Sequence, residues 1–389
     1  MKEYDRIQIQ EICSRICSGG TPKSTVEKYY GGNIPWLNTK EVNFNRIHST
    51  ERTITEEGLL NSSAKWIDEN AVIVAMYGAT AGKSAISKIR LTTNQACCNL
   101  NIDPDKADYR FVYYALYNDY NRLASLANGG AQQNLNAMQI KEFEIPYPSI
   151  EEQTAIAIFL SALDDKIEVN RQINDNLEQQ AQATFNNIIA NSANEKTVQL
   201  SEIAWLNPKR IIPKGTVARS IEMAHLPITG SFPSGWEMKE YNGGMKFQNG
   251  DTLMARITPC LENGKVAFIN FLDDNEIAFG STEYITLTPK REFAPEVLYF
   301  LVRNNDFVDF AVKNMNGSSG RQRVSADTIG TYELPDITQY ELHMLETVAK
   351  ESLTKIKYNS LENMRLAEIR DTLLPKLMSG ELKFNEIDC

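Results

Sequence analysis

The residues that come closest to a catalytic motif form a glycine-rich loop, Gly78-Ala-Thr-Ala-Gly-Lys83-Ser84, which is similar to a nucleotide phosphate-binding loop. A true phosphate-binding loop has four residues between its first glycine and Gly-Lys-Ser/Thr, whereas this chain has three. The residues that follow, 85–91, are typical of a strand, but a phosphate-binding loop must open a helix whose N-terminus faces the phosphates. The sequence therefore argues against nucleotide hydrolysis by this chain.

Metal and thiol chemistry is disfavoured by the cysteine and histidine positions. None of the six cysteines forms a Cys-x-x-Cys pair, and none of the three histidines lies beside a cysteine pair, so four close zinc ligands cannot be assembled. We expect no metal, and we expect Cys97 and Cys98 to fill a strand core as small apolar residues. The chain also lacks the Asn-Pro-Pro-aromatic motif of adenine methyltransferases and Gly-x-Gly-x-x-Gly. A Ser/His/Asp arrangement stays open, but no nucleophile elbow supports it. We therefore expect a binding and scaffolding protein without catalytic residues.

Composition indicates a folded protein of two to three domains. The chain has 389 residues, of which 42% are hydrophobic and 23% charged, enough to bury a core. Its longest apolar runs, such as 71–76, are too short to cross a bilayer, and its first residues are not of signal-peptide type. We expect a cytoplasmic location and no membrane partner.

The net charge of −10 argues against a nucleic-acid ligand only when it is averaged over the whole chain. Phosphate binding depends on local lysine and arginine, and residues 205–219 carry four basic residues and no acidic one. The acidic total therefore does not exclude basic patches on the surface of the chain.

The chain repeats itself once. Three matches share one order and a nearly constant offset of about 190 residues: 9–12 with 200–203, 82–86 with 264–268, and 133–146 with 322–335. Each half begins with a mixed α/β part whose short β-branched runs indicate strands at 72–74, 100–102, 266–269 and 284–287. Helices are expected at 109–126 and 295–312. We predict an α+β protein with these parts: a domain at 1–149, a central long helix at 150–196, a domain at 197–337, a C-terminal long helix at 338–380 and a tail at 381–389.

The two long helices carry a heptad pattern. Apolar residues recur every three or four positions from Ile156 to Ile188 and from Leu345 to Leu377. Asparagines stand at repeat-equivalent positions of that pattern: Asn170 and Asn174, then Asn359 and Asn363. A polar residue at a seam costs stability but specifies register. The alternative is that these asparagines are simply exposed. We predict an antiparallel coiled coil of roughly 57 Å, with the two domains in a pseudo-two-fold arrangement at its opposite ends.

Short distinctive segments are spread over the chain: Ser18-Gly-Gly-Thr-Pro22, Gly32-Asn-Ile-Pro-Trp36, Met76-Tyr-Gly-Ala-Thr80, Thr93-Asn-Gln-Ala96, Gly129-Gly-Ala-Gln-Gln-Asn-Leu135, Ile145-Pro-Tyr-Pro-Ser149 and Leu373-Leu-Pro-Lys-Leu-Met-Ser-Gly-Glu381. Through these segments the whole chain resembles the specificity subunits of type I restriction-modification systems. The second half keeps the Gly-Lys and Leu-Pro landmarks but lacks Gly-Gly-Thr-Pro and Ile-Pro-Trp.

This resemblance implies a non-catalytic subunit that reads double-stranded DNA. Each domain is expected to be a target recognition domain for half of a split site. The coil is expected to set the gap between the halves and to dock two methyltransferase subunits. Those partners use S-adenosylmethionine, and restriction subunits with ATP and Mg can join them. The chain itself is expected to hold no cofactor.

Two loops of each domain are the candidates for DNA contact. The first loop is expected to bind phosphates and supplies Tyr77, Thr80, Lys83 and Ser84 in one half, and Arg256, Thr258, Asn263 and Lys265 in the other. The second is expected to read bases, since arginine pairs with guanine and glutamine or asparagine with adenine. It supplies Gln132, Gln133 and Asn134, and Arg321, Gln322 and Arg323. The alternative for the first loop is a strand turn with a solvated lysine. The rival class is a protein-interaction scaffold that binds no DNA.

Overall fold

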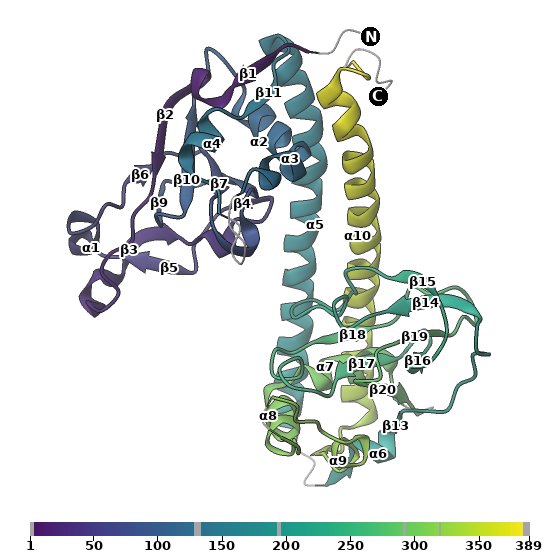
Figure 1. Cartoon of the computed structure of the whole chain (residues 1–389). Coiled ribbons are helices and arrows are strands. Elements are labelled where there is room, and N and C mark those ends of the chain that lie inside the picture. The colour runs from purple at the N-terminus through teal and green to yellow at the C-terminus, as the bar shows by residue number, and fades with distance from the viewer. Residues whose placement is uncertain (1–3, 128–133, 193–195, 291–292, 319, 384–389) are drawn as a thin grey trace. The chain divides into compact units, whose positions relative to one another are not determined.

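The computed structural model describes residues 4–127, 134–192, 196–290, 293–318 and 320–383, and the chain forms two compact units. Unit 1 comprises Met1–Asp165 with Leu366–Cys389, and unit 2 comprises Lys166–Arg365. Two long helices, α5 (Ile150–Asn191) and α10 (Gln339–Ser379), contribute to both units (Figure 1). Within the described residues, no helix combines the length and apolar character needed to span a membrane.

Unit 1 contains three sheets among its described residues (Figure 1). A two-stranded sheet pairs β1 (Arg6–Gln8) with β11 (Glu144–Pro146). A five-stranded sheet has the order β2 (Cys13–Ser18), β10 (Cys97–Ile102), β7 (Val72–Ala75), β8 (Ser84–Ser87) and β4 (Asn45–Ile47). A four-stranded sheet has the order β5 (Arg52–Ile54), β3 (Tyr30–Leu37), β9 (Leu91–Thr93) and β6 (Trp66–Ile67). The helices are α1 (Glu56–Leu60), α2 (Tyr109–Asn118), α3 (Tyr120–Ser125) and α4 (Ala137–Lys141).

Unit 2 repeats this topology. A two-stranded sheet pairs β12 (Thr197–Gln199) with β21 (Glu333–Pro335). One four-stranded sheet has the order β13 (Ala204–Leu206), β20 (Tyr284–Pro289), β17 (Thr252–Ala255) and β18 (Val266–Phe268). The other has the order β15 (Glu237–Glu240), β14 (Val217–Ile221), β19 (Ala278–Gly280) and β16 (Met245–Phe247). The helices are α6 (Leu200–Ile203), α7 (Pro295–Val302), α8 (Asn305–Lys313) and α9 (Ala326–Gly330).

The pairing pattern confirms the repeat that the sequence predicts. The order β2-β10-β7-β8 of unit 1 matches β13-β20-β17-β18 of unit 2, and β5-β3-β9-β6 matches β15-β14-β19-β16. In each second sheet the two central strands are parallel and their neighbours are antiparallel. The predicted α+β class with two long helices is confirmed as well.

Local sequence explains where these elements begin and end. The four residues of β7 are all buried, as expected for a short apolar run in a sheet centre. Cys97 and Cys98 lie fully buried in β10, as predicted. Asp108 caps α2 by accepting from the Arg110 N–H, and Asn136 opens α4 with a capping box completed by Gln139.

Several predicted bounds are wrong, because polar caps interrupt an otherwise helical pattern. The expected helix at 109–126 is two helices that meet at Asp119, which lies outside αR geometry. The one at 295–312 stops at Arg303, and Asn304 starts α8 with side-chain bonds to two backbone N–H groups. Helix α5 ends at Asn191, and residues 193–195 of the predicted segment 150–196 lie outside the described residues.

The long helices run antiparallel within each unit. In unit 1 the apolar core joins Ile156 and Leu160 of α5 to Leu374 and Leu377 of α10. In unit 2 it joins Ala181 and Phe185 of α5 to Leu345, Ala349, Leu353 and Ile356 of α10. Residue numbers rise along one helix as they fall along the other, so the predicted antiparallel pairing is confirmed.

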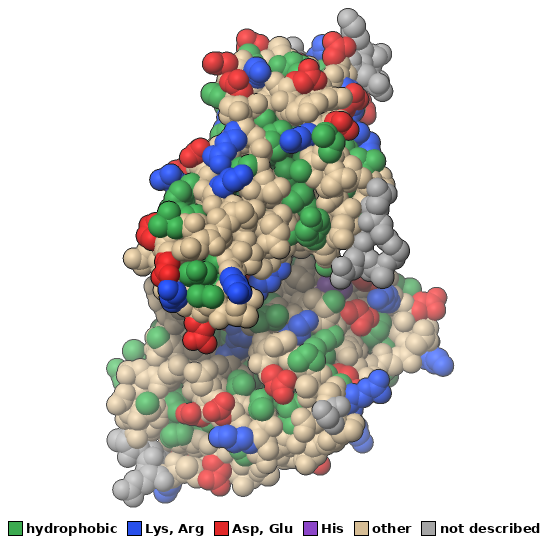
Figure 2. Space-filling view, turned by 60° about the vertical axis from the view of Figure 1, so that its left-hand side comes forward, with side chains coloured by type: hydrophobic (Ala, Val, Ile, Leu, Met, Phe, Trp, Pro, Cys, Tyr) green, Lys and Arg blue, Asp and Glu red, His purple; other side chains and the backbone are tan. Residues whose placement is uncertain are grey.

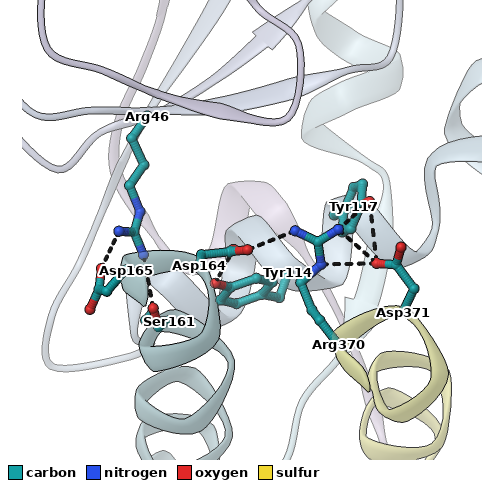
Figure 3. A network of polar contacts seen from close by, with 8 residues as sticks. All are labelled: Arg46, Tyr114, Tyr117, Ser161, Asp164, Asp165, Arg370 and Asp371. Atoms are coloured by element: carbon teal, nitrogen blue, oxygen red, sulfur yellow. Dashed lines mark hydrogen bonds and ion pairs between the residues drawn. The ribbon is translucent and has the colours of Figure 1, made fainter. Parts of the chain in front are cut away.

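A polar network attaches the sheets and α2 of unit 1 to both helices (Figure 3). Asp164 is its centre: Tyr114 donates to Oδ2 at 2.6 Å and Arg370 to Oδ1 at 2.6 Å. Arg370 also donates to Asp371 and to the Tyr117 hydroxyl, while Arg46 of β4 donates to Asp165 and to the Ser161 carbonyl. Arg370 and Asp164 are only 16% and 15% exposed, so each would be a costly unpaired charge without the other.

In unit 2, different residues attach the mixed domain to the long helices. Glu178 of α5 accepts from the Tyr299 hydroxyl of α7 and from Arg303. Burial raises the pKa of Glu178, while the bonds from Tyr299 and Arg303 oppose that rise. Each unit therefore ties its mixed domain to the helix pair through a tyrosine, an arginine and a carboxylate.

Replacing Arg370 with methionine should weaken the helix pairing of unit 1. The variant keeps the apolar stem but leaves Asp164 without its ion pair, so local opening of 366–379 should become about 2–3 kcal/mol easier. Amide hydrogen exchange followed by mass spectrometry reads this segment directly. Arg365→Met removes an exposed arginine of the same helix and should leave exchange unchanged; equal protection in the two variants would contradict the role given to Arg370.

Candidate nucleic-acid interface

The two candidate loops lie side by side within each unit. In unit 1 the segment after β7 forms an antiparallel bridge between Tyr77 and Asn134, and the Leu135 N–H donates to the Met76 carbonyl at 2.8 Å. In unit 2 the segment after β17 bridges Ile257 with Arg323. In each unit, main-chain bonds therefore join the described residues of the two loops that the sequence singled out separately.

A third segment completes this frame. In unit 1 the Met76 N–H donates to the Ala96 carbonyl at 2.8 Å. In unit 2 the Arg256 N–H donates to the Glu283 carbonyl at 3.0 Å, and the Val324 N–H donates to the Arg256 carbonyl at 3.0 Å. We call this arrangement the three-segment frame; it comprises residues 76–77, 96 and 134–135 in unit 1, and 256–257, 283 and 323–324 in unit 2.

The first-loop residues of unit 1 differ in what they can reach. Tyr77 is 43% exposed at the loop tip. Lys83 donates to the Asn43 side chain at 2.6 Å and lies over the Phe44 ring, and the Thr80 hydroxyl donates to the Thr39 carbonyl at 2.9 Å. Lys83 and Thr80 are thus held by neighbouring loops and only partly exposed.

Ser84 requires a correction. It lies in β8 with no exposed surface, and its hydroxyl has no hydrogen-bond partner among the described residues. A side chain buried in the centre of a sheet cannot contact DNA, so Ser84 is removed from the candidate interface. The Gly-Lys pair marks the turn into the strand, and β8 begins at Ser84 itself, so this side chain belongs to the sheet and not to the loop.

The second loop of unit 1 is described only in part. Gln132 and Gln133 lie outside the described residues, whereas Asn134 is exposed on the frame. Its main-chain bridge to Tyr77 places that exposed amide beside the first loop.

The first-loop residues of unit 2 are more strongly engaged with their own domain. Lys265 donates to the Met223 carbonyl at 2.7 Å, and the Thr258 hydroxyl donates to the Gln322 carbonyl at 3.3 Å. Asn263 is exposed. Of these three residues, Asn263 therefore has the side chain most accessible to a ligand.

Charge is concentrated where the second loop of unit 2 meets the frame. Arg323 donates two hydrogen bonds to Glu283, from Nε to Oε2 at 2.8 Å and from Nη2 to Oε1 at 2.7 Å. These bonds lower the pKa of Glu283 and keep it ionised at neutral pH. Arg321 is exposed, and Gln322 is partly buried with its carbonyl accepting from the Thr258 N–H at 3.0 Å.

Glu283 was missed by the sequence reasoning, although its position held a signal. It directly precedes a predicted strand, and the antiparallel pair of Ala255 with Tyr284 brings position 256 opposite position 283. That register depends on sheet pairing, which residue spacing alone did not provide.

The basic stretch at 205–219 is only partly available as a surface. Arg210 is buried in an ion pair with Asp251 at 2.9 Å, and Arg219 pairs with Asp273 at 3.0 Å and Glu276 at 3.3 Å. Lys209 and Lys214 are exposed. Basic and acidic side chains are interspersed on the face drawn in Figure 2, so that face offers phosphates no broad positive surface.

The four predicted coil asparagines meet within unit 2. Asn170 donates to Glu362 at 2.7 Å and to Asn363 at 2.9 Å. Asn359 donates to Asn174 at 2.8 Å, and Asn174 donates to Ser360 at 3.3 Å. Asn170 and Asn359 are almost fully buried, so the alternative that these side chains are merely exposed does not hold for them.

Comparison with known proteins gives one consistent result. Residues 1–179 match the family model of the type I restriction modification DNA specificity domain. The chain is 27% identical to the type I restriction enzyme MjaIX specificity subunit of Methanocaldococcus jannaschii, over 99% of this chain and 95% of that protein. It is 30% identical to the EcoR124I/EcoR124II specificity subunit of Escherichia coli over 38% of this chain and 37% of that one. The fold is similar to the crystal structure of a type I restriction-modification S subunit from M. genitalium, with a TM-score of 0.60, 19% identity and 96% of both chains covered.

Replacing Asn170 with alanine should destabilise the helix pair of unit 2. The change removes two hydrogen bonds and leaves the Asn363 side-chain oxygen without its donor. This loss should lower the free energy of unfolding by about 1–3 kcal/mol. The thermal unfolding midpoint reports the loss, and Asn176→Ala, at an exposed position of the same helix, is the matched control.

The paired substitution Asn170→Leu with Asn363→Leu tests whether apolar residues at these two positions can replace the stability that the hydrogen bonds supply. Two apolar seam residues should restore or exceed the original midpoint, since no polar group is left unpaired. An Asn170→Ala protein as stable as Asn176→Ala would show that these bonds do not hold the helices together.

Proposed function

Because the chain belongs to the family of type I restriction-modification specificity subunits, we propose that it reads a bipartite DNA sequence for a larger methyltransferase complex. Each unit reads one half of the site through its three-segment frame. The chemistry is carried out by partner subunits and not by this chain.

The observation that carries this proposal is one frame with two sets of side chains. The main-chain bonds of the frame are the same in both units, which preserves the shape of the surface. The accessible side chains differ: Tyr77 and Asn134 in unit 1, Arg321 and the 40% exposed Arg323 in unit 2. Since base edges are distinguished by their donors and acceptors, two such surfaces suit two different half-sites.

In this proposal the paired helices have two tasks. They set the gap between the half-sites, and they dock two methyltransferase subunits, which use S-adenosylmethionine and flip the adenine that they methylate. Restriction subunits with ATP and Mg can join the complex. Exposed apolar residues one turn apart on α5, Val169 and Ile173, supply the kind of surface that such docking needs.

The rival function is a protein-interaction scaffold that binds no DNA. It would use the same exposed apolar positions but would need no divergence between the two frames. The acidic total of the chain is compatible with either function, because net charge does not identify what one surface binds.

Co-purified with its methyltransferase, the chain should bind a duplex carrying its site with an affinity that falls steeply with salt. Neutralised phosphates release counterions, so the logarithm of affinity should fall linearly with the logarithm of salt concentration. The site itself comes from sequencing methylated adenines in cells that carry the pair, and a scrambled duplex is the control. Failure to retard any duplex at low salt, alone or with the methyltransferase, would favour the scaffold.

One heptad inserted after Asp165 in α5 and another after Arg365 in α10 should change the gap of the methylated site. Both insertions preserve the seam and lengthen the helices by about 10 Å, which corresponds to roughly three base pairs at most. The added length also rotates one half-site around the duplex, so activity should fall. The methylated motif is the readout, and insertion into α5 alone, which shifts the seam, is the control. Full activity on the original gap would contradict a spacing role.

A further inference from the structure

The three-segment frame of unit 2 carries a charged trio where unit 1 carries none. Position for position, Arg256, Glu283 and Arg323 correspond to Met76, Ala96 and Asn134, because the same main-chain bonds join them. Met76 and Ala96 are buried apolar residues. The charges are therefore not required by the frame, since an apolar pair builds it equally well in unit 1.

The hydrogen bonds of Arg323 leave a defined edge free. A guanidinium has five N–H donors in a rigid plane. Two are taken by Glu283, and a third, from Nη1, is given to the Arg321 carbonyl at 3.2 Å. One donor then remains on each terminal nitrogen, and guanidinium N–H groups are the donors that bind guanine O6 and N7. The Arg323 side chain is 40% exposed, so this edge is accessible.

Glu283 makes that edge a poor site for phosphate. Its carboxylate neutralises Arg323 and would repel a phosphate that approached the pair. Arg256 lies close enough to Glu283 to help keep it ionised, and its Nε is buried without a hydrogen-bond partner among the described residues. A fork that a carboxylate holds in one orientation suits hydrogen bonding to a base better than it suits charge attraction to the backbone.

We infer that Glu283 determines specificity in unit 2, by holding Arg323 so that its free edge reads one guanine of the half-site. This inference rests on the proposed function and adds to it a residue and a base. Glu283 acts through Arg323 and need not touch DNA itself.

The test uses the chain in complex with its methyltransferase, and measures methylation rates on duplexes carrying each base pair at every position of both half-sites. The original complex should require guanine at one position of one half-site. Arg323→Lys keeps the charge but loses the fork, and should reduce discrimination at that position by about ten- to a hundred-fold. Glu283→Gln should relax the same position and steepen the salt dependence of binding, because a negative charge is lost.

Glu240→Gln, at an exposed acidic position of β15 in the same unit and outside both loops, is the matched control and should change no base preference. Unchanged preference at the other half-site shows that each variant is folded and assembled. A Glu283→Gln complex with every preference intact would overturn the inference, as would relaxation at both half-sites. An original complex that methylates no bipartite site would instead overturn the proposed function.

Discussion

The antiparallel pairing of α5 with α10 is the constraint on which the rest of the fold depends. In each unit a mixed domain buries part of its core against both helices, so neither domain core is complete without the pair. Apolar packing supplies most of the free energy, but it tolerates sliding. The polar contacts remove that freedom: Asp164 with Arg370 in unit 1, and Asn170 with Asn363 in unit 2, each satisfied only in one register.

This pairing also explains why the repeat could diverge at its surface. The strand order and the frame bonds are common to both units, whereas the tyrosine, arginine and carboxylate that attach each domain to the helices stand at different positions. Tyr114 of α2 donates to an aspartate, and Tyr299 of α7 donates to a glutamate. The two tyrosines do not stand at the same distance from the start of their helices. The common element is main-chain geometry, and side chains on either side of it have changed independently.

Sequence reasoning predicted the fold well because its main features are periodic. The repeat, the heptad seam and the four coil asparagines follow from spacing, and the structure places Asn170 and Asn359 in the seam. Bounds failed where a single cap such as Asn304 interrupts a helical pattern.

The candidate interface was predicted less completely, because it depends on pairing between distant segments. Spacing identified both loops, but not that Tyr77 would bridge Asn134 or that Glu283 would lie beside Arg323. It also placed Ser84 on the surface, since a loop motif does not reveal where the following strand enters the sheet. Two basic residues of the stretch at 205–219 are taken up by ion pairs that only the fold reveals.

The division of the chain between the units has a consequence for how the protein is made. Unit 2 is one continuous stretch, 166–365, and all of it is synthesised before the last helical turns of α10. Unit 1 is discontinuous: its core includes Leu374, Leu377 and Met378, which are translated after the whole of unit 2. The first domain therefore emerges with an unfilled apolar face and waits through the synthesis of the second. Closing the core of unit 1 therefore depends on residues that are synthesised after the whole of unit 2.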